Sequence, residues 1–241
     1  MSVETVQFSF VVLTFNSARY IGRCLSALAE TVSALGVTAE LFIIDNGSRD
    51  DTRALIREFA LPAELELTLI EFEYNTGTTF SRNQALAKVR GDYIVVLDSD
   101  AYLNAEALNG LREFLQVNPD CGMAVPRLTY PDGRWQMSTD EFPGVLRKVQ
   151  RFFFLKDIEA REVQNLVSGK VDYAISACWV MPAAVVKQVG LDVLGPKRSG
   201  KHFLAEIFVG RASQHIDQEI PIEQIDAHAG QAFAPFTFDS L

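Results

Sequence analysis

The chain repeatedly places a short, apolar-rich run before a segment whose apolar residues recur at helical spacing. The apolar-rich runs cover residues 8–15, 40–45, 65–73, 91–98 and 121–130. The helical segments between them cover residues 16–30, 51–60, 79–90 and 104–118, with Asn16 or Ser17 as the N-cap of the first. A run that is apolar on both faces is typical of a parallel sheet, and strands alternating with helices predict right-handed βαβ units. We therefore predict an α/β fold with a doubly wound, mostly parallel sheet flanked by helices.

Polar clusters follow four of the predicted strands, at the point where each strand ends. They read TFN at 14–16, DNGS at 45–48, NTG at 75–77 and DSD at 98–100. In an open α/β sheet the ligand binds outside the carboxyl ends of the strands. If the strands are parallel, the four clusters meet at one edge, and we expect a shared ligand crevice there.

Two aspartates, Asp98 and Asp100, follow five successive apolar residues at 93–97. If the strand remains extended past Leu97, their side chains point to the same side, because side chains alternate along a strand. The two carboxylates can then share a hard cation, Mg²⁺ or Mn²⁺, together with water and a diphosphate. The alternative is an ordinary turn and a helix cap ahead of the next helix.

Three further polar residues at this edge are candidates for ligand contacts. Asp45 closes a buried strand, and its carboxylate can accept hydrogen bonds from a base or a ribose; the alternative is a plain turn capped by Ser48 or Asp50. Asn75 lies in a similar turn. Arg82 lies in the first turn of the following helix and can pair with a phosphate or with one of the aspartates, or be an exposed helical arginine.

Composition excludes several classes of protein. The chain has 241 residues, a net charge of −9 and 48% hydrophobic residues, which suits one large α/β domain and disfavours nucleic-acid binding. Its three scattered cysteines indicate neither a disulfide framework nor a zinc site. No apolar run approaches the length of a membrane span, so we expect a cytoplasmic protein.

Several blocks occur together in a characteristic order: VVLTFN, IIDNGSRDDT, NTGTTFSRNQALAKVRGDYIVVLDSDA and ISACWVMPAAVVKQVG. With these blocks the chain resembles the inverting nucleotide-sugar glycosyltransferases of family 2, which have the GT-A fold, and among them it is most similar to rhamnosyltransferase-like members. The resemblance covers roughly residues 8–192. It implies a catalytic core at 1–192 and leaves 193–241 as an atypical C-terminal segment, either on the acceptor side or a truncated remnant.

The resemblance also implies roles for individual residues. Thr14, Asn16 and Asp45 would hold the base and ribose, and Asn75 and Arg82 would line the donor pocket. Asp98 would lie near the ribose and the metal, and Asp100 would bind Mg²⁺ or Mn²⁺. The strand at 176–181 would let the donor sugar approach the acceptor. The implied donor is dTDP- or UDP-linked, and the implied acceptor is a glycan or a lipid-linked acceptor in the synthesis of a bacterial surface polysaccharide.

The chain departs from the family pattern after residue 192. The acidic pair that would deprotonate the acceptor is absent, and Glu206 and Asp192 are the nearest candidates for the general base. His215 or His228 can supply a third metal ligand, or be an ordinary surface histidine. The basic, aromatic segment 144–156 can lie against an anionic membrane surface, or pack its phenylalanines on the core or a partner.

Three functions follow from these patterns. The first is an inverting, metal-dependent sugar transferase. The second is a GT-A domain that binds a nucleotide sugar but has lost its general base. The third is a nucleotidyltransferase that makes the sugar nucleotide, which the absence of a glycine-rich, basic loop near the N-terminus disfavours.

Overall fold

The structure is a computed structural model, and it describes residues 6–130, 133–140, 153–154, 158, 169–171, 173–189 and 207–209. The strands are β1 (Phe8–Thr14), β2 (Ala39–Asp45), β3 (Leu65–Glu71), β4 (Tyr93–Asp98), β5 (Met123–Val125), β6 (Leu128–Thr129), β7 (Trp135–Gln136), β8 (Thr139–Asp140), β9 (Gly169–Val171), β10 (Tyr173–Ala174), β11 (Cys178–Pro182) and β12 (Ile207–Val209). The helices are α1 (Ile21–Leu35), α2 (Thr52–Glu58), α3 (Thr78–Leu86), α4 (Ala105–Val117) and α6 (Ala183–Val189).

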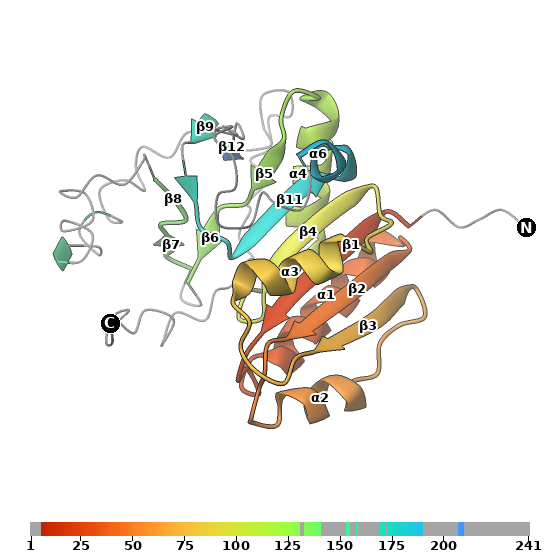
Figure 1. Cartoon of the computed structure of the whole chain (residues 1–241). Helices are drawn as coiled ribbons and strands as arrows, with labels where there is room; N and C mark the ends of the chain where they lie inside the picture. Colours follow the sequence, from red (N-terminus) through yellow and green to blue (C-terminus); the bar gives the residue numbers. More distant parts are fainter. Residues whose placement is uncertain are drawn as a thin grey trace, which may run out of the picture.

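One large sheet organises the molecule (Figure 1). Its strand order is β3-β2-β1-β4-β11-β5-β12-β9, and β6 pairs with β7 and β8 with β10 in two small ribbons. The first four strands are parallel, and β11 runs antiparallel to both β4 and β5. The predicted α/β fold with a doubly wound, mostly parallel sheet is confirmed.

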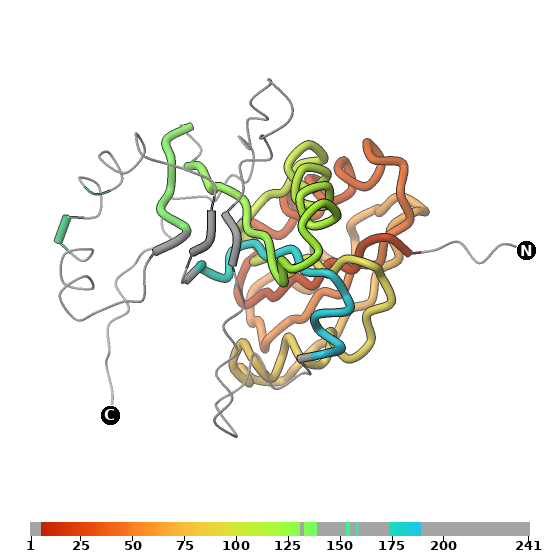
Figure 2. The backbone as a smooth tube through the Cα atoms, turned by 90° about the horizontal axis from the view of Figure 1, so that it is seen from above, coloured from red at the N-terminus to blue at the C-terminus, as the bar shows by residue number. Residues whose placement is uncertain are grey.

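Helices cover both faces of the sheet (Figure 2). On one face α1, α2 and α4 pack over Phe8, Phe10 and Val12, the residues of β1 that point toward them. On the other face α3 and α6 cover Val11 and its neighbours from β2, β4 and β11. Alternate residues of β1 are therefore buried on opposite faces, which explains why its sequence is predominantly apolar.

Two local predictions were wrong. Helix α1 begins at Ile21, and its N-cap residue Tyr20 makes no side-chain hydrogen bond, so neither Asn16 nor Ser17 caps it. The predicted strand at 121–130 is two short strands, β5 and β6, interrupted at Pro126. Proline has no N–H group to donate to a ladder, and after it the chain leaves the large sheet to pair with β7.

The far edge of the sheet includes a strand from beyond residue 192. β12 pairs in parallel with β5 and antiparallel with β9. The division of the chain at residue 192 stays a prediction. Of the segment 144–156, the described residues are Phe153 and Phe154, both exposed. None of the helices in the described part of the chain has the length and hydropathy needed to cross a bilayer.

A buried acidic residue holds together the N-terminal ends of the parallel strands. The carboxylate of Glu40 in β2 is almost wholly buried and accepts from the Ser9 hydroxyl at 2.6 Å. It also accepts from the backbone N–H of Arg90 at 2.5 Å and from the Arg90 guanidinium at 2.8 Å. Arg90 also donates to Glu66 at 2.6 Å, so one arginine ties β2 and β3 to the loop before β4.

Candidate functional site

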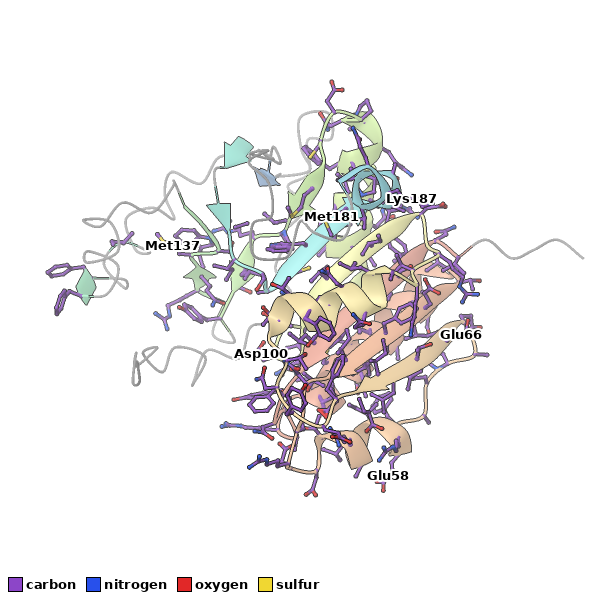
Figure 3. The ribbon with its side chains drawn as sticks, in the orientation of Figure 1. Glu58, Glu66, Asp100, Met137, Met181 and Lys187 are labelled. Carbon is purple, nitrogen blue, oxygen red and sulfur yellow. The ribbon has the colours of Figure 1, made fainter. Side chains whose placement is uncertain are left out.

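The C-terminal ends of the four parallel strands lie together. The register places Thr14 of β1 opposite Asp45 of β2, and Leu13 opposite Asp98 of β4. Figure 3 shows Asp100 at this edge and Glu66 at the opposite edge of the sheet. From β1 the chain adds β2 and β3 on one side, and it then places β4 on the other side of β1. Open α/β sheets bind ligands at such a reversal of the strand order.

The loop after β1 is fastened to the loop after β2. The N–H of Asn16 donates to the Ser48 hydroxyl, and the side-chain oxygen of Asn16 accepts from the N–H of Arg49, both at 2.8 Å. Ser17 donates its N–H to the Thr52 hydroxyl at 2.7 Å. Asn16 has a φ of 51°, a left-handed conformation that asparagine tolerates better than most residues. Its side chain therefore serves the loop and not the start of α1.

Asp45 is completely buried at the end of β2. Its carboxylate accepts from the Ser48 N–H at 3.0 and 3.2 Å and from the Arg53 guanidinium at 2.5 Å. Arg53 also donates to the carbonyl of Phe72, just beyond β3, at 2.5 Å. These internal partners offset the cost of burying the Asp45 carboxylate. Asp45 thereby holds the loop after β2 against helix α2.

The loop after β2 is fastened in turn to the loop after β3 through Asn46. Its amide donates to Asn75 at 2.9 Å, and its side-chain oxygen accepts from the N–H of Thr76 at 2.9 Å. Next to it, Gly47 has a φ of 90°, and an added Cβ would lie 2.7 Å from the backbone of Tyr74. The close approach of the two loops therefore requires glycine at this position.

Arg82 connects the loop after β3 with the end of β4. Its side chain is 6% exposed, and its guanidinium forms an ion pair with Asp98. Within the described part of the chain, the Arg82 Nε and the buried hydroxyl of Thr14 have no hydrogen-bond partner. Two buried polar groups at this edge therefore have hydrogen-bonding capacity that the described residues do not use.

The D-x-D segment, which is DSD at residues 98–100, is a turn and not an extended strand. β4 ends at Asp98, and the N–H of Ala101 donates back to the Asp98 carbonyl at 3.1 Å. The condition on which strand alternation would place both carboxylates on one side, a strand extended as far as Asp100, is therefore not met. Between the two aspartates, the Ser99 hydroxyl donates to the Ser17 hydroxyl at 2.8 Å, which fastens this turn to the loop after β1.

Burial raises the pKa of Asp98 to about 6, with a further rise from the Asp100 charge, although Arg82 opposes both. The thiol of Cys24 on α1 has its pKa raised to about 12, first by burial and then by the charges of Asp100 and Asp98. Negative charge is thus concentrated at this turn. A divalent cation suits such a site, because it offsets the repulsion between two carboxylates whose oxygens are its preferred ligands.

Together these bonds form a closed ring of four loops, at residues 15–18, 46–52, 75–82 and 98–100. Each loop is joined to the next, and Ser99 returns the connection to Ser17. A ring of this kind fixes the strand ends before any ligand arrives, which is what a preorganised binding site requires.

Comparison with known proteins identifies the family. The model of the family described as glycosyl transferase family 2 matches residues 9–190. The chain belongs to glycosyl transferase family 2. The match contains the whole four-loop ring and ends after helix α6.

Two curated relatives of this family 2 chain match it over less than half its length. The poly(ribitol-phosphate) beta-N-acetylglucosaminyltransferase TarS of Staphylococcus aureus is 31% identical over 111 residues, which is 46% of this chain and 19% of TarS. The succinoglycan biosynthesis protein ExoO of Rhizobium meliloti is 37% identical over 106 residues, 44% of this chain and 28% of ExoO. The matched region thus spans less than a third of each relative.

Solved structures show the same fold. The crystal structure of S. aureus TarS 1–349 in complex with UDP-GlcNAc has a TM-score of 0.52 and 21% identity, covering 76% of this chain and 47% of that one. The mannosyltransferase PcManGT from Pyrobaculum calidifontis, in complex with GDP-Man and Mn²⁺, has a TM-score of 0.52 and 20% identity, with coverages of 78% and 48%. The predicted GT-A fold is confirmed.

The structure of this family 2 chain brings together the seven residues predicted for the donor and metal: Thr14, Asn16, Asp45, Asn75, Arg82, Asp98 and Asp100. The strand predicted at 176–181 lies beside them, since the Asp98 N–H donates to the Ala177 carbonyl at 3.1 Å. The predicted general bases Glu206 and Asp192, and the histidines His215 and His228, lie outside the described residues.

Sequence reasoning missed three residues that hold the site together. Asn46 was predicted only as part of the DNGS cluster at 45–48, and Ser99 and Arg53 were given no role. The residue types of Asn46 and Ser99 indicated that each would form hydrogen bonds if buried, because a buried Asn or Ser needs hydrogen-bond partners. The identity of those partners was not contained in the local sequence.

Proposed function

We propose that the chain is the donor-binding and catalytic domain of an inverting glycosyltransferase that uses a nucleotide-diphosphate sugar. The observation that carries the proposal is the meeting of Arg82 and the D-x-D turn with the loops after β1 and β2 at the switch point of the sheet. A diphosphate is bound by cationic side chains and by a metal ion with carboxylate ligands, and a nucleoside is bound by polar loops next to that site. This edge supplies both within one ring.

The nucleoside is proposed to bind over the ends of β1 and β2. Thr14 lies beneath this site at the end of β1, and its buried hydroxyl has no partner among the described residues. Asn16 and Phe15 are exposed at the rim of the same loop, and Phe15 offers an aromatic face for a base. Because its carboxylate is enclosed, Asp45 contributes to base and ribose binding chiefly by shaping the second loop.

The diphosphate is proposed to lie between Arg82 and the D-x-D turn. Asp98 and Asp100 would hold Mg²⁺ or Mn²⁺, which when bound offsets the charge of the diphosphate as a leaving group. The Arg82 guanidinium, held beside this turn by its ion pair with Asp98, would offset the charge of the phosphates from the other side. Asn75 fixes the loop that leads to Arg82.

The acceptor hydroxyl is proposed to attack the anomeric carbon in line with the bond to the diphosphate, which inverts the configuration. Its proton passes to a carboxylate, with Glu206 or Asp192 as the candidates. The acceptor is a glycan or a lipid-linked glycan of a bacterial surface polysaccharide. The printed names of TarS and ExoO, which concern poly(ribitol phosphate) and succinoglycan, support this class of acceptor.

The base of the donor is proposed to be uracil or thymine, with rhamnose among the sugars to be tested. The two solved relatives were crystallised with UDP-GlcNAc and with GDP-Man. Isothermal titration with UDP-GlcNAc, UDP-glucose, dTDP-rhamnose and GDP-mannose, each with and without Mn²⁺, ranks these donors. Binding that requires Mn²⁺ is expected for at least one of them.

Asp100→Ala tests the metal site, and Asp92→Ala is its control. Asp92 precedes β4 at the opposite edge of the sheet and is exposed, so its loss leaves the site intact. We expect Asp100→Ala to abolish the dependence of donor binding on Mn²⁺ while Asp92→Ala retains it. Equal Mn²⁺-dependent affinity in both variants would refute the proposed metal site.

The second candidate function is a domain that binds the donor without transferring its sugar. The observation that favours it is the lack of the family's acidic pair after residue 192. The two functions differ in a donor-turnover assay that measures nucleoside diphosphate release with and without a glycan acceptor. Release that disappears in Asp100→Ala shows catalysis, whereas tight Mn²⁺-dependent binding with no release shows a binding domain.

A further inference from the structure

Helix α3 begins without a cap of its own. Gly77 occupies the N-cap position with a φ of 83° and offers no side chain to the first turn. The helix has nine residues, and Thr78 and Phe80 of its first turn are exposed. A short helix without a cap has a frayed first turn unless another part of the chain supplies hydrogen bonds.

Asn46, from the loop after β2, does not cap the N–H groups of this turn, but it bonds to residues on both sides of the helix start. Its side-chain oxygen accepts from the N–H and the hydroxyl of Thr76 at 2.9 and 3.1 Å, and the hydroxyl of Ser81 lies within 3.0 Å. Its amide donates to Asn75 at 2.9 Å. One side chain therefore contacts the residues before the helix and the residue that completes its first turn.

Asn46 is also a rigid point of attachment. It is 2% exposed, and its own N–H donates to the carbonyl of Thr14 at 2.9 Å, which continues the hydrogen bonding of β1 and β2. The start of α3 is therefore attached to the end of the central sheet as well as to the loop that precedes the helix.

Arg82 directly follows Ser81. Its guanidinium is enclosed and reaches Asp98, so its position depends on where the first turn of α3 lies. If that turn moves, the arginine leaves Asp98 and its enclosure.

We propose that Asn46 is a positioning residue that holds the start of α3 so that Arg82 faces the D-x-D turn. The consequence for donor binding rests on the proposed function. The geometric claim does not, because it concerns only where the Arg82 guanidinium lies.

The test measures the reaction of Arg82 with phenylglyoxal, which modifies accessible guanidinium groups, in the folded protein by peptide mass spectrometry. In the natural chain Arg82 is protected by burial. We expect Asn46→Ala to raise its rate of modification about tenfold, the change expected when one or two net hydrogen bonds that hold a closed state are lost.

The matched control is Asn118→Ala. Asn118 is the C-cap of α4, and its amide donates to the carbonyl of Phe114 at 2.8 Å, so this variant also loses an asparagine hydrogen bond at a helix end. We expect it to leave the reactivity of Arg82 unchanged. Arg57, which is exposed, serves within each sample as the reference for reagent activity.

A second variant keeps the test decisive if Asn46→Ala does not fold. Ser81→Ala removes one of the contacts to Asn46, together with the contacts of the Ser81 hydroxyl with the Thr76 hydroxyl and the Gly77 carbonyl, and leaves the bonds between Asn46 and Thr76 in place. We expect a smaller rise in Arg82 reactivity than in Asn46→Ala. A folded Asn46→Ala or Ser81→Ala protein in which Arg82 reacts as slowly as in the natural chain overturns the proposal.

Donor titrations separate this inference from the proposed function. If both hold, Asn46→Ala and Arg82→Ala each weaken binding of the nucleotide sugar, and the double variant is little weaker than Arg82→Ala alone, since both changes remove the same contact. Independent, additive losses would overturn the positioning role. If the natural chain binds no nucleotide sugar, the proposed function fails, and the phenylglyoxal result still decides the role of Asn46.

Discussion

The hydroxyl of Ser99 donates a 2.8 Å hydrogen bond to the hydroxyl of Ser17, which is 82 residues away in the chain. Both side chains are buried, and each belongs to a different loop of the site. This one bond joins the D-x-D turn to the loop proposed to hold the nucleoside. A displacement of one of these two loops is therefore expected to displace the other.

Removing that bond is expected to weaken the site more than the fold. Ser99→Ala should lower the free energy of unfolding by about 1 kcal/mol, the net value of one buried hydrogen bond. It should also weaken Mn²⁺-dependent donor binding. Ser26→Ala, which removes a hydroxyl bonded to Gly22 within α1, is the control. Urea denaturation and calorimetric titration give the two quantities, and equal donor affinity in both variants would contradict the expectation.

The pKa of Asp98 predicts how donor binding depends on pH. Burial raises that pKa to about 6, so the carboxyl is neutral below this pH and is then a poor metal ligand. Mn²⁺-dependent binding should be constant above this pKa and should weaken by about tenfold for each pH unit below it, because one proton competes with the metal. Donor binding is therefore expected to be lost as the pH falls, and not as it rises.

The probe for this measurement is a nucleotide sugar, because its diphosphate is a diester and takes up no proton in this range, whereas the terminal phosphate of UDP does. Binding that stays constant to well below the raised pKa of Asp98 would show that this carboxyl is not a metal ligand.

Two glycines with positive φ offer a matched pair for the packing of the loops. Gly36, with a φ of 59°, has open space around an added Cβ, and Gly36→Ala should destabilise the protein by about 1 kcal/mol. Gly47→Ala adds a clash with the backbone of Tyr74 and should cost about 3 kcal/mol or more. Thermal and urea denaturation measure both, and a similar loss in the two variants would show that the loops after β2 and β3 do not pack closely.

The buried carboxylate of Glu40 predicts a large stability effect far from the site. Glu40→Ala leaves the Ser9 hydroxyl and the Arg90 N–H without their acceptor and should lower the free energy of unfolding by about 1–3 kcal/mol. Glu66→Ala removes an exposed partner of the same arginine and should have little effect. Donor binding should be unchanged in both variants, and equal stability of the two would contradict this assignment.

Much of the fold was predictable from the sequence. The four runs that became β1 to β4 and the helices between them were found within five residues at each end, because burial on one or both faces leaves a periodic pattern in the chain. The exceptions have local causes. Pro126 interrupted the predicted fifth strand, and Asn16 and Ser17 were used by a neighbouring loop and not by α1.

The candidate site was predictable only as a set of residues. Polar side chains after parallel strands must gather at one edge of a sheet, so Asp45, Asn75 and Asp98 were expected together. Their partners were not. Arg82 was expected to pair with a phosphate or an aspartate, and the structure shows the aspartate to be Asp98.

The sequence by itself therefore determined which segments are strands, which are helices, and at which edge the polar residues collect. Only the tertiary structure decided that Asn16 bonds to Ser48, that Asn46 bonds to Asn75 and Thr76, and that Ser99 bonds to Ser17. The physical reason is the range of the interactions. Hydrophobic periodicity is written into neighbouring residues, whereas hydrogen bonds between loops 29 to 82 residues apart depend on strand order and register, which form only when the sheet assembles.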